Sequence, residues 1–297
     1  MVLNVRNNEV EPNNHNPNVK RKGYHVVLTI AGSDSSGGAG IQADIKTFAA
    51  LGVYGATAIT AITAQNTLGV HSLFSIAPHM VYDQIIAVMD DLSPSVIKIG
   101  MLSNVEIVVA VAEALSQYSI PIILDPVIVS TSGHRLLSAE AEKILKQRLL
   151  PMSTLITPNN PEMETLSNMS VSTFEEKRRA AEHLFSYGVR SILLKGGHEV
   201  GSTKSDILFA NTPMGMQSTI FTSDTISTRN THGTGCTLSS AIAAYMARGC
   251  DLREAIVHAK EYITEAIRSG ADIAIGHGFG PVNHGFNPQK MTTYEIE

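Results

Sequence analysis

From Tyr24 onward the sequence alternates short runs rich in Ile, Val, Leu and Thr with amphipathic stretches of helical spacing. The runs expected to form strands are 25–31, 54–64, 96–99, 120–125, 155–157 and 191–195. The stretches expected to form helices are 40–50, 80–92, 106–116, 139–149, 174–187 and 237–248. Because several strand runs are apolar almost throughout, helices should cover both faces of the sheet. The alternation therefore predicts a doubly wound α/β domain with a central, mostly parallel sheet.

The remaining segments add to this core without dividing it. Residues 208–209 and 217–221 are expected to extend the sheet as short antiparallel strands, and a long helix should follow Asp251 to about residue 269. A tail rich in Gly, His and Pro comes next, at 276–287. Residues 1–23 are rich in Asn and lack the apolar core of a signal peptide. We therefore expect a disordered N-terminal leader over 1–23 and a single domain over 24–297.

Charge and cysteine content narrow the classes of partner. The chain has 22 Lys and Arg against 27 Asp and Glu, a formal net charge of -5, and no basic block beyond residues 20–22. Nucleic acid is therefore not an expected partner. No run reaches the roughly 18 to 20 apolar residues of a membrane helix. The chain of 297 residues has two cysteines, Cys236 and Cys250, which could form at most one disulfide, too few to stabilise a fold of this size. The low cysteine content favours a reducing compartment and a cytoplasmic protein.

A glycine-rich segment, 230–237, precedes an apolar helical pattern and predicts a tight loop that opens a helix. Helix N-termini present unpaired N–H groups and positive dipole ends, so Gly233, Thr234 and Gly235 are expected to bind an anion. Cys236 falls in the first turn, where the pKa of a thiol is lowered and the side chain can act as a base. A phosphate cradle beside a proton acceptor suits phosphoryl transfer to a hydroxyl. The alternative is a glycine loop with a small buried cysteine.

Polar residues follow several of the predicted strands. Asp125, Asn159, Glu162 and Lys195 lie at or just after three successive strand ends. Ligands collect at this edge of α/β sheets, and carboxylate, amide and ammonium groups together suit Mg²⁺ and polyphosphate. Taken singly, Asp125 or Glu162 could instead be a helix cap or a surface charge. The glycine-rich segment 31–44 after the first strand is not a Walker A loop, because no Gly-Lys-Ser/Thr follows; the alternative is a plain strand-to-helix turn.

Six motifs in order resemble one known family. They are 29–34 with 36–44, 64–67, 98–102, 157–159 with Glu162, 195–198 and 230–237. The chain resembles the ribokinase-like superfamily, and within it the hydroxymethylpyrimidine and hydroxymethylpyrimidine phosphate kinases of thiamine biosynthesis. The resemblance extends from about Tyr24 to His284, and residues 1–23 have no counterpart in it.

The resemblance implies a ribokinase-like fold, ATP with Mg²⁺, and two successive phosphorylations of 4-amino-5-hydroxymethyl-2-methylpyrimidine. It assigns Cys236 as the base and Gly233, Thr234 and Gly235 as the anion hole. It assigns Asp125 and Glu162 to the metal, Lys195 and Asn159 to the nucleotide phosphates, and Gly32, Asp44, Gln65, Met101 and Val127 to the pyrimidine pocket. The Gln65 amide can both donate and accept, as an aminopyrimidine edge requires. The family usually forms dimers, so a homodimer is expected.

Other functions stay open at this point. Sugar kinases of the superfamily usually carry Asp where Cys236 stands, whereas some pyridoxal kinases carry Cys, so a pyridoxal or pyridoxine kinase is the alternative. A dinucleotide-dependent oxidoreductase would need a Gly-x-Gly-x-x-Gly fingerprint, of which Gly38 and Gly40 give only part. A non-catalytic binding protein would have no need of Cys236. An assay with ATP, Mg²⁺ and candidate alcohols, read by the mass of the product, separates the vitamin kinase, the oxidoreductase and the non-catalytic binding protein.

Overall fold

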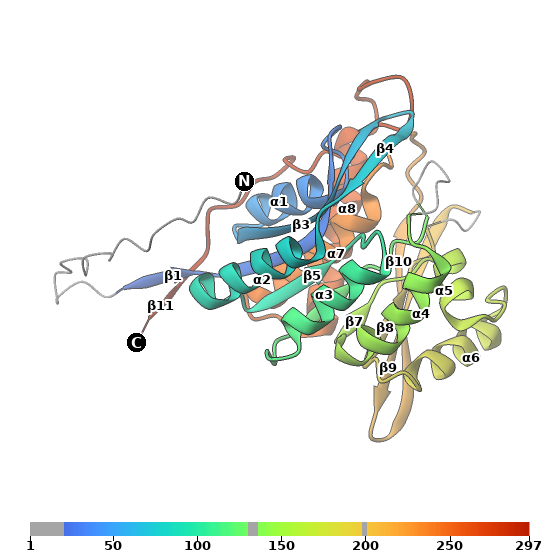
Figure 1. The fold of residues 1–297 in the computed structure, drawn as a ribbon. Coiled ribbons are helices and arrows are strands. Elements are labelled where there is room, and N and C mark those ends of the chain that lie inside the picture. The colour runs from blue at the N-terminus through green and yellow to red at the C-terminus, as the bar shows by residue number, and fades with distance from the viewer. Residues whose placement is uncertain (1–20, 130–135, 198–200, 297) are drawn as a thin grey trace, which may run out of the picture.

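The computed structural model describes residues 21–129, 136–197 and 201–296 (Figure 1). The strands are β1 (Lys22–Tyr24), β2 (Val26–Asp34), β3 (Tyr54–Asn66), β4 (Gly69–Ser75), β5 (Val96–Ile99), β6 (Ile122–Leu124), β7 (Leu155–Ile156), β8 (Ser191–Leu194), β9 (Thr203–Thr212), β10 (Gly215–Asp224) and β11 (Thr293–Glu295). The helices are α1 (Gly40–Ala50), α2 (Pro78–Leu92), α3 (Val105–Leu115), α4 (Ala139–Arg148), α5 (Asn160–Ser167), α6 (Phe174–Phe185), α7 (Thr234–Ala247) and α8 (Leu252–Gly270), with a short 3₁₀ turn at Leu150–Met152.

Nine strands form one sheet in the order β10-β9-β8-β7-β6-β5-β2-β3-β4. The central pairs, from β3 through β2, β5, β6 and β7 to β8, are parallel. The outer pairs β3–β4, β8–β9 and β9–β10 are antiparallel. The predicted α/β fold with a mostly parallel sheet is therefore confirmed, with an antiparallel extension at each edge.

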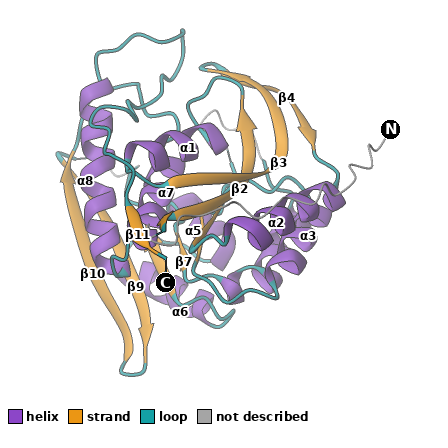
Figure 2. Cartoon of the chain, turned by 90° about the vertical axis from the view of Figure 1, so that its left-hand side faces the viewer, coloured by secondary structure: helices purple, strands orange, loops and turns teal. Residues whose placement is uncertain are grey.

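Both faces of the sheet are covered by helices (Figure 2), which explains the continuous apolar strands. In β2, Leu28 packs into the core beneath α2, α3, α4 and α6, whereas its neighbour Val27 packs into the core beneath α1, α7 and α8. Successive side chains of a strand point to opposite faces, so a strand buried on both must be apolar at every position. All four residues of β5 are buried, and three of them are apolar for the same reason; the charged Lys98 is the exception.

Each of the twelve expected elements exists, with ends shifted by a few residues at most. The strands β9 and β10 are longer than the expected 208–209 and 217–221. Three features were not expected from the sequence: β4 pairs along the edge of the sheet, helix α5 begins at Asn160 and Pro161, and β1 pairs with β11. Proline is well tolerated in a first helical turn, which explains α5.

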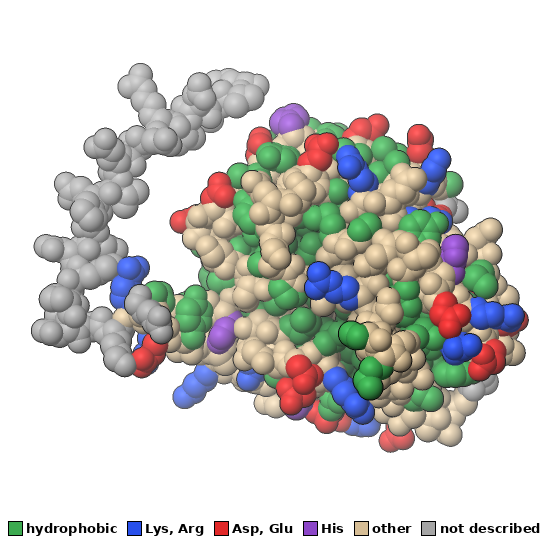
Figure 3. Space-filling model, turned by 90° about the horizontal axis from the view of Figure 1, so that it is seen from below, with side chains coloured by type: hydrophobic (Ala, Val, Ile, Leu, Met, Phe, Trp, Pro, Cys, Tyr) green, Lys and Arg blue, Asp and Glu red, His purple; other side chains and the backbone are tan. Residues whose placement is uncertain are grey.

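The expected leader lies mostly outside the described residues. Residues 1–20 are not described, while Lys22–Tyr24 pairs antiparallel with Thr293–Glu295. Strand β1 therefore includes Lys22 and Gly23, which lie before the expected start of the domain at residue 24. Within the described part of the chain, no helix combines the length and apolarity needed to cross a membrane. On the face seen in Figure 3, Lys and Arg side chains lie scattered among acidic and uncharged ones.

Candidate active site

A cavity of about 860 Å³ lies at the carboxyl ends of the parallel strands. Residues at the ends of β2, β5, β6 and β8 line it together with the first turn of α7 and one side of α8. This is the edge at which open α/β sheets bind ligands, and the volume is within the range of small-molecule sites. The fold therefore brings the expected strand-end residues and the glycine loop to one place.

Close backbone contact joins the two glycine-rich segments. Gly233 is the N-cap of α7 with φ of 83°, and a Cβ added there would lie 1.8 Å from the carbonyl oxygen of Gly38. A Cβ on Gly38 would in turn lie 2.5 Å from Cδ2 of His232. Only glycine fits a left-handed position pressed against another backbone. The loop after β2 and the loop before α7 thus form one wall of the cavity.

Cys236 lies in the first turn of α7 and lines the cavity, as predicted. The expectation of a lowered thiol pKa is wrong. Burial raises the pKa of Cys236 to about 11, and the carboxylates of Asp44 and Asp125 act in the same direction. The Lys98 ammonium and a hydrogen bond with the Gly40 backbone oppose the shift without cancelling it. Helix-end effects amount to about 2 kcal/mol at most, less than burial of a charge can cost.

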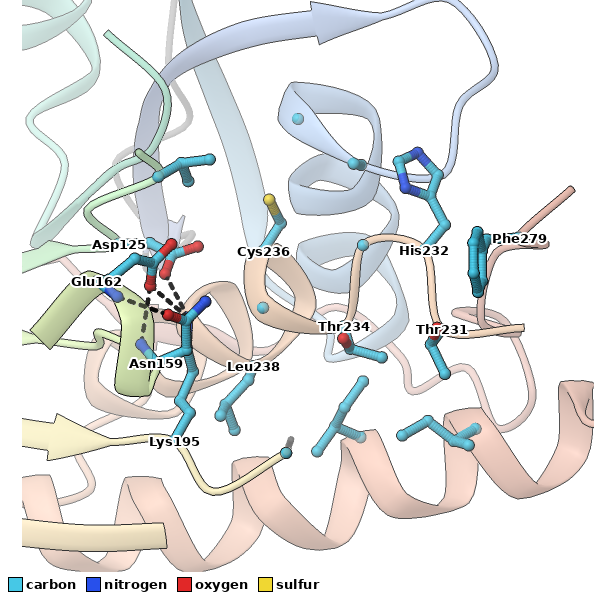
Figure 4. Close-up of a pocket in the computed structure, with 18 of the residues that line it drawn as sticks. Asp125, Asn159, Glu162, Lys195, Thr231, His232, Thr234, Cys236, Leu238 and Phe279 are labelled. Atoms are coloured by element: carbon cyan, nitrogen blue, oxygen red, sulfur yellow. Dashed lines mark hydrogen bonds and ion pairs between the residues drawn. The ribbon is translucent and has the colours of Figure 1, made fainter. Parts of the chain in front are cut away.

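The charged end of the cavity is built around Asp125 and Lys195 (Figure 4). Asp125 Oδ1 accepts hydrogen bonds from Lys195 Nζ at 2.8 Å and from Thr157 Oγ1 at 3.0 Å. A Cβ on Gly235 would lie 3.2 Å from Lys195 Nζ, so the glycine loop adjoins this pair. Lys195 and Lys98 hold the pKa of Asp125 below its usual value despite burial, so the carboxylate is ionised.

Asn159 and Glu162 line the same end and also cap α5. The Asn159 side chain accepts from the Glu162 backbone N–H, and the Glu162 carboxylate accepts from the Asn159 backbone N–H, both at 2.8 Å. The helix-cap alternative is therefore correct as a description of local structure. Burial raises the pKa of Glu162 to about 7, against the pull of Lys195, whose Nζ lies 3.9 Å away.

Four of the five residues expected at the pyrimidine pocket line the cavity: Gly32, Gln65, Met101 and Val127. A Cβ on Gly32 would lie 2.5 Å from Met101 Cε, so the glycine lets the methionine lie across the end of β2. Gln65 is half-buried. It already has two neighbours, Thr63 Oγ1 at 3.2 Å and His232 Nε2 at 3.3 Å.

Asp44 differs from the expectation. Its carboxylate is fully buried, pairs with Lys98 Nζ at 2.9 Å and accepts hydrogen bonds from Thr29 and Ser240 at 2.6 Å. It lies on the face of α1 that packs on the sheet and does not line the cavity. Asp44 therefore holds the Lys98 ammonium in place, and the expectation that it lines the pocket is wrong.

Lys98 and two further side-chain pairs at the cavity had no role assigned from the sequence. Lys98, inside the apolar strand β5, is fully buried yet reaches the cavity. His232 Nε2 lies 2.8 Å from Asp34 Oδ2, and Lys260 Nζ lies 2.6 Å from Asp206 Oδ2. A lysine within an otherwise apolar strand was the one signal available for Lys98. The other two pairs join residues far apart in sequence.

Apolar side chains line part of the cavity toward α8, beside the Lys260–Asp206 pair. They are Leu238 of α7, Ile263 and Ile267 of α8, and Phe279; Leu238 and Phe279 are labelled in Figure 4. In the same view Cys236 lies between the charged residues and His232. A ligand that fills the cavity would therefore contact the charged residues at one end and apolar side chains along α8. The Cys236 thiol would lie beside it, between the charged residues and His232.

Comparison with known proteins identifies relatives over most of the chain. A family model described as phosphomethylpyrimidine kinase matches residues 34–283. A hydroxymethylpyrimidine/phosphomethylpyrimidine kinase of Bacillus subtilis is 44% identical over 262 residues, which are 88% of this chain and 94% of that protein. A bifunctional thiamine biosynthesis protein of Geobacter sulfurreducens is 49% identical over 259 residues, 87% of this chain. The chain spans about half, 52%, of that longer protein.

Comparison with solved structures also finds phosphomethylpyrimidine and pyridoxal kinases. A phosphomethylpyrimidine kinase of Clostridium difficile superposes with a TM-score of 0.72 at 42% identity, covering 82% of this chain and 99% of that one. The ADP complex of a Bacillus subtilis pyridoxal kinase superposes with a TM-score of 0.80 at 36% identity, covering 88% and 98%. The predicted resemblance to the vitamin kinases of the ribokinase-like superfamily is thereby confirmed. The chain belongs to the phosphomethylpyrimidine kinase family.

Proposed function

We propose that this chain transfers a phosphoryl group from ATP to the hydroxyl of 4-amino-5-hydroxymethyl-2-methylpyrimidine, and then to the phosphate of the monophosphate. One observation carries the proposal: the Cys236 thiol lines one cavity together with the charged Asp125 and Lys195 and the neutral Gln65 and Met101. The family and the names of the relatives at 44–49% identity favour this substrate. Pyridoxal is less well supported, because the neighbours named pyridoxal kinase are 29–36% identical.

The nucleotide is proposed to enter from the α8 side. The apolar floor of Leu238, Ile263 and Ile267 suits a purine ring, and Lys195 beside Gly235 suits the phosphates. The related pyridoxal kinases solved with ADP or AMP-PCP support a nucleotide donor. Free N–H groups in the first turn of α7 would hold the transferring phosphoryl group between donor and acceptor.

Asp125 and Glu162 are proposed to hold Mg²⁺. Two buried carboxylates near a lysine fit this ion, which commonly takes one or two carboxylates and completes its coordination with waters and phosphate oxygens. Among the described residues no cluster of three or more His, Cys, Asp or Glu could hold a metal, so phosphate oxygens would have to share the coordination. The bound ion would neutralise charge on the phosphates.

Cys236 is proposed to accept the proton of the attacking hydroxyl. With a pKa of about 11 the thiol is neutral at pH 7, so the thiolate must form within the assembled complex. The buried Lys98 ammonium is the main group acting in that direction, and Asp44 keeps it in place. Gln65 would hold the amine edge of the ring, while Met101 and Val127 pack on its faces.

Phosphorylation of the pyrimidine by the purified protein, with ATP and Mg²⁺, tests the proposal. Product masses should show one and then two added phosphoryl groups, and chelation of Mg²⁺ should stop both steps. Absence of phosphorylated product at saturating ATP would refute it.

A cytoplasmic location and a homodimer remain predictions; light scattering of the purified protein checks the second.

A further inference from the structure

His232 lies at the rim of the cavity between a carboxylate and an amide. Its Nε2 is 2.8 Å from Asp34 Oδ2 and 3.3 Å from the nitrogen end of the Gln65 amide. The ring is nearly buried and packs on Gly38, and the His232 backbone N–H donates to Gly280 at 3.0 Å. His232 is the residue that precedes the N-cap of α7, so it is held firmly beside the anion loop.

The proton on His232 can be placed from its partners. Asp34 also accepts hydrogen bonds from the backbone N–H groups of Ser36, Gly38 and Ala39 and from the Ser36 hydroxyl, at 2.7–3.2 Å. These donors and His232 lower the pKa of Asp34 to about 2, so it is an ionised acceptor. An imidazole nitrogen 2.8 Å from such an oxygen must carry a proton. Nε2 of His232 is therefore a donor.

Thr63 imposes a second constraint on the same amide. Its hydroxyl has one proton, and two acceptors compete for it: the Ser33 carbonyl oxygen at 2.9 Å and the oxygen end of the Gln65 amide at 3.2 Å. The shorter bond to the carbonyl takes the proton, so Thr63 Oγ1 is left as an acceptor on the Gln65 side. The Gln65 backbone is fixed separately, through reciprocal bonds with Ser35 Oγ at 2.7 and 2.8 Å.

These constraints agree on one orientation. His232 Nε2 carries the proton that it donates to Asp34 and has no lone pair with which to accept from an amide NH₂, so the amide oxygen belongs on the His232 side, whereas the acceptor on Thr63 takes the NH₂; this is the amide turned by 180° about its last bond. We propose that His232, braced by Asp34, is a positioning residue which with Thr63 fixes the orientation of the Gln65 amide and thereby selects the hydrogen-bonding pattern of the accepted ring. This inference rests on the proposed function, since Gln65 is taken there as the ring-binding residue.

The kinetic test compares the aminopyrimidine with its 4-oxo counterpart, in which the donor and acceptor of the ring edge are exchanged. The wild type should prefer the amino compound in kcat/KM by at least about tenfold. In His232→Leu the amide is free to turn, and the preference should fall to within about threefold, mainly through KM. His232→Gln restores a donor and should recover most of the preference. His258→Leu, on the exposed surface of α8, is the matched control.

Thr63→Val provides a second route to the same result, because it removes the acceptor while keeping the His232–Asp34 pair; it also removes the hydrogen bond to the Ser33 carbonyl. It too should reduce the preference. Retention of the wild-type ratio in both His232→Leu and Thr63→Val, with loss of the ratio in Gln65→Leu, would overturn the positioning role and leave the proposed function standing.

A readout independent of activity separates the two proposals. In the NMR spectrum of the wild-type protein, the Nε2 shift of His232 should be that of a protonated nitrogen, and the Gln65 amide protons should show contacts to the Thr63 methyl group. Contacts to the His232 ring proton Hε1 in their place would overturn the assigned orientation. This result holds whether or not the pyrimidine is phosphorylated.

Discussion

The two ends of the cavity are built by different means. At the phosphate end, Asp125, Lys195 and Glu162 are buried charges that partly neutralise one another at the ends of neighbouring strands. At the ring end, neutral groups such as Gln65 and Met101 meet two loops that pack through Gly32 and Gly38. The first arrangement is imposed by sheet topology, and the second by local contacts between loops. Changes at the phosphate end should therefore reduce turnover, and changes at the ring end should alter which alcohol is accepted.

The largest effect is expected where the two ends meet. Cys236→Ala should lower kcat by on the order of 10² to 10⁴, the usual cost of losing a general base, while pyrimidine binding by calorimetry stays within about twofold. Cys250→Ala, at the other half-buried cysteine, is the matched control and should be nearly as active as the wild type. Wild-type turnover in Cys236→Ala would reduce this residue to a packing role.

A smaller effect is expected at the phosphate end alone. Glu162→Gln keeps a side chain that can still cap α5 but removes a charge, so the Mg²⁺ concentration for half-maximal rate should rise on the order of tenfold. Pyrimidine affinity measured without ATP should hardly change. Equal damage to pyrimidine binding would mean that the charge belongs to the ring end, and the division between the ends would fail.

The ring end should control the choice of vitamin. The wild type is expected to prefer the hydroxymethylpyrimidine over pyridoxal in kcat/KM by at least about tenfold, and Gln65→Leu should erase most of that preference. The reason is that an unmatched buried amide costs about 1 to 3 kcal/mol, although the half-buried position of Gln65 favours the lower part of that range. An unchanged ratio in Gln65→Leu would assign selectivity to other residues.

The smallest effect is a pH dependence confined to the phosphate end. The pKa of Glu162 is raised to about 7, above its usual value, so this carboxyl holds its proton until the pH nears 7. Since a metal binds the ionised form, Mg²⁺-nucleotide affinity should weaken severalfold as pH falls from 7 to 6, with proton release on binding. Calorimetry in buffers of different ionisation enthalpy measures this. If Mg²⁺-nucleotide affinity depends on pH in the same way in Glu162→Gln, the titrating group is a different residue.

The sequence predicted the phosphate end better than the ring end, for a physical reason. Parallel strands buried on both faces are visible as apolar runs, and their carboxyl ends meet at one edge whatever the loops do. Asp125, Asn159, Glu162 and Lys195 could therefore be placed together from their position after strands. The start of α7 was equally visible, because the glycines precede a helical pattern.

Features that depend on distant residues were not predictable in this way. Asp44 was misplaced because only the packing of α1 on the sheet decides that its carboxylate pairs with Lys98. The thiol pKa of Cys236 was misjudged because it depends on burial and on the charges of Lys98, Asp44 and Asp125, none of which adjoins Cys236 in sequence. Strands β1 and β11 pair residues near opposite ends of the chain, and neither is long enough to be recognised alone.

A competition experiment tests the central claim most directly. The protein is given ATP, Mg²⁺ and equal concentrations of hydroxymethylpyrimidine and pyridoxal, and product masses are followed from the first turnovers. The account predicts that the pyrimidine monophosphate forms first and is then converted to the diphosphate, while pyridoxal phosphate lags by about tenfold or more. Faster formation of pyridoxal phosphate, or no phosphorylated pyrimidine, would contradict it.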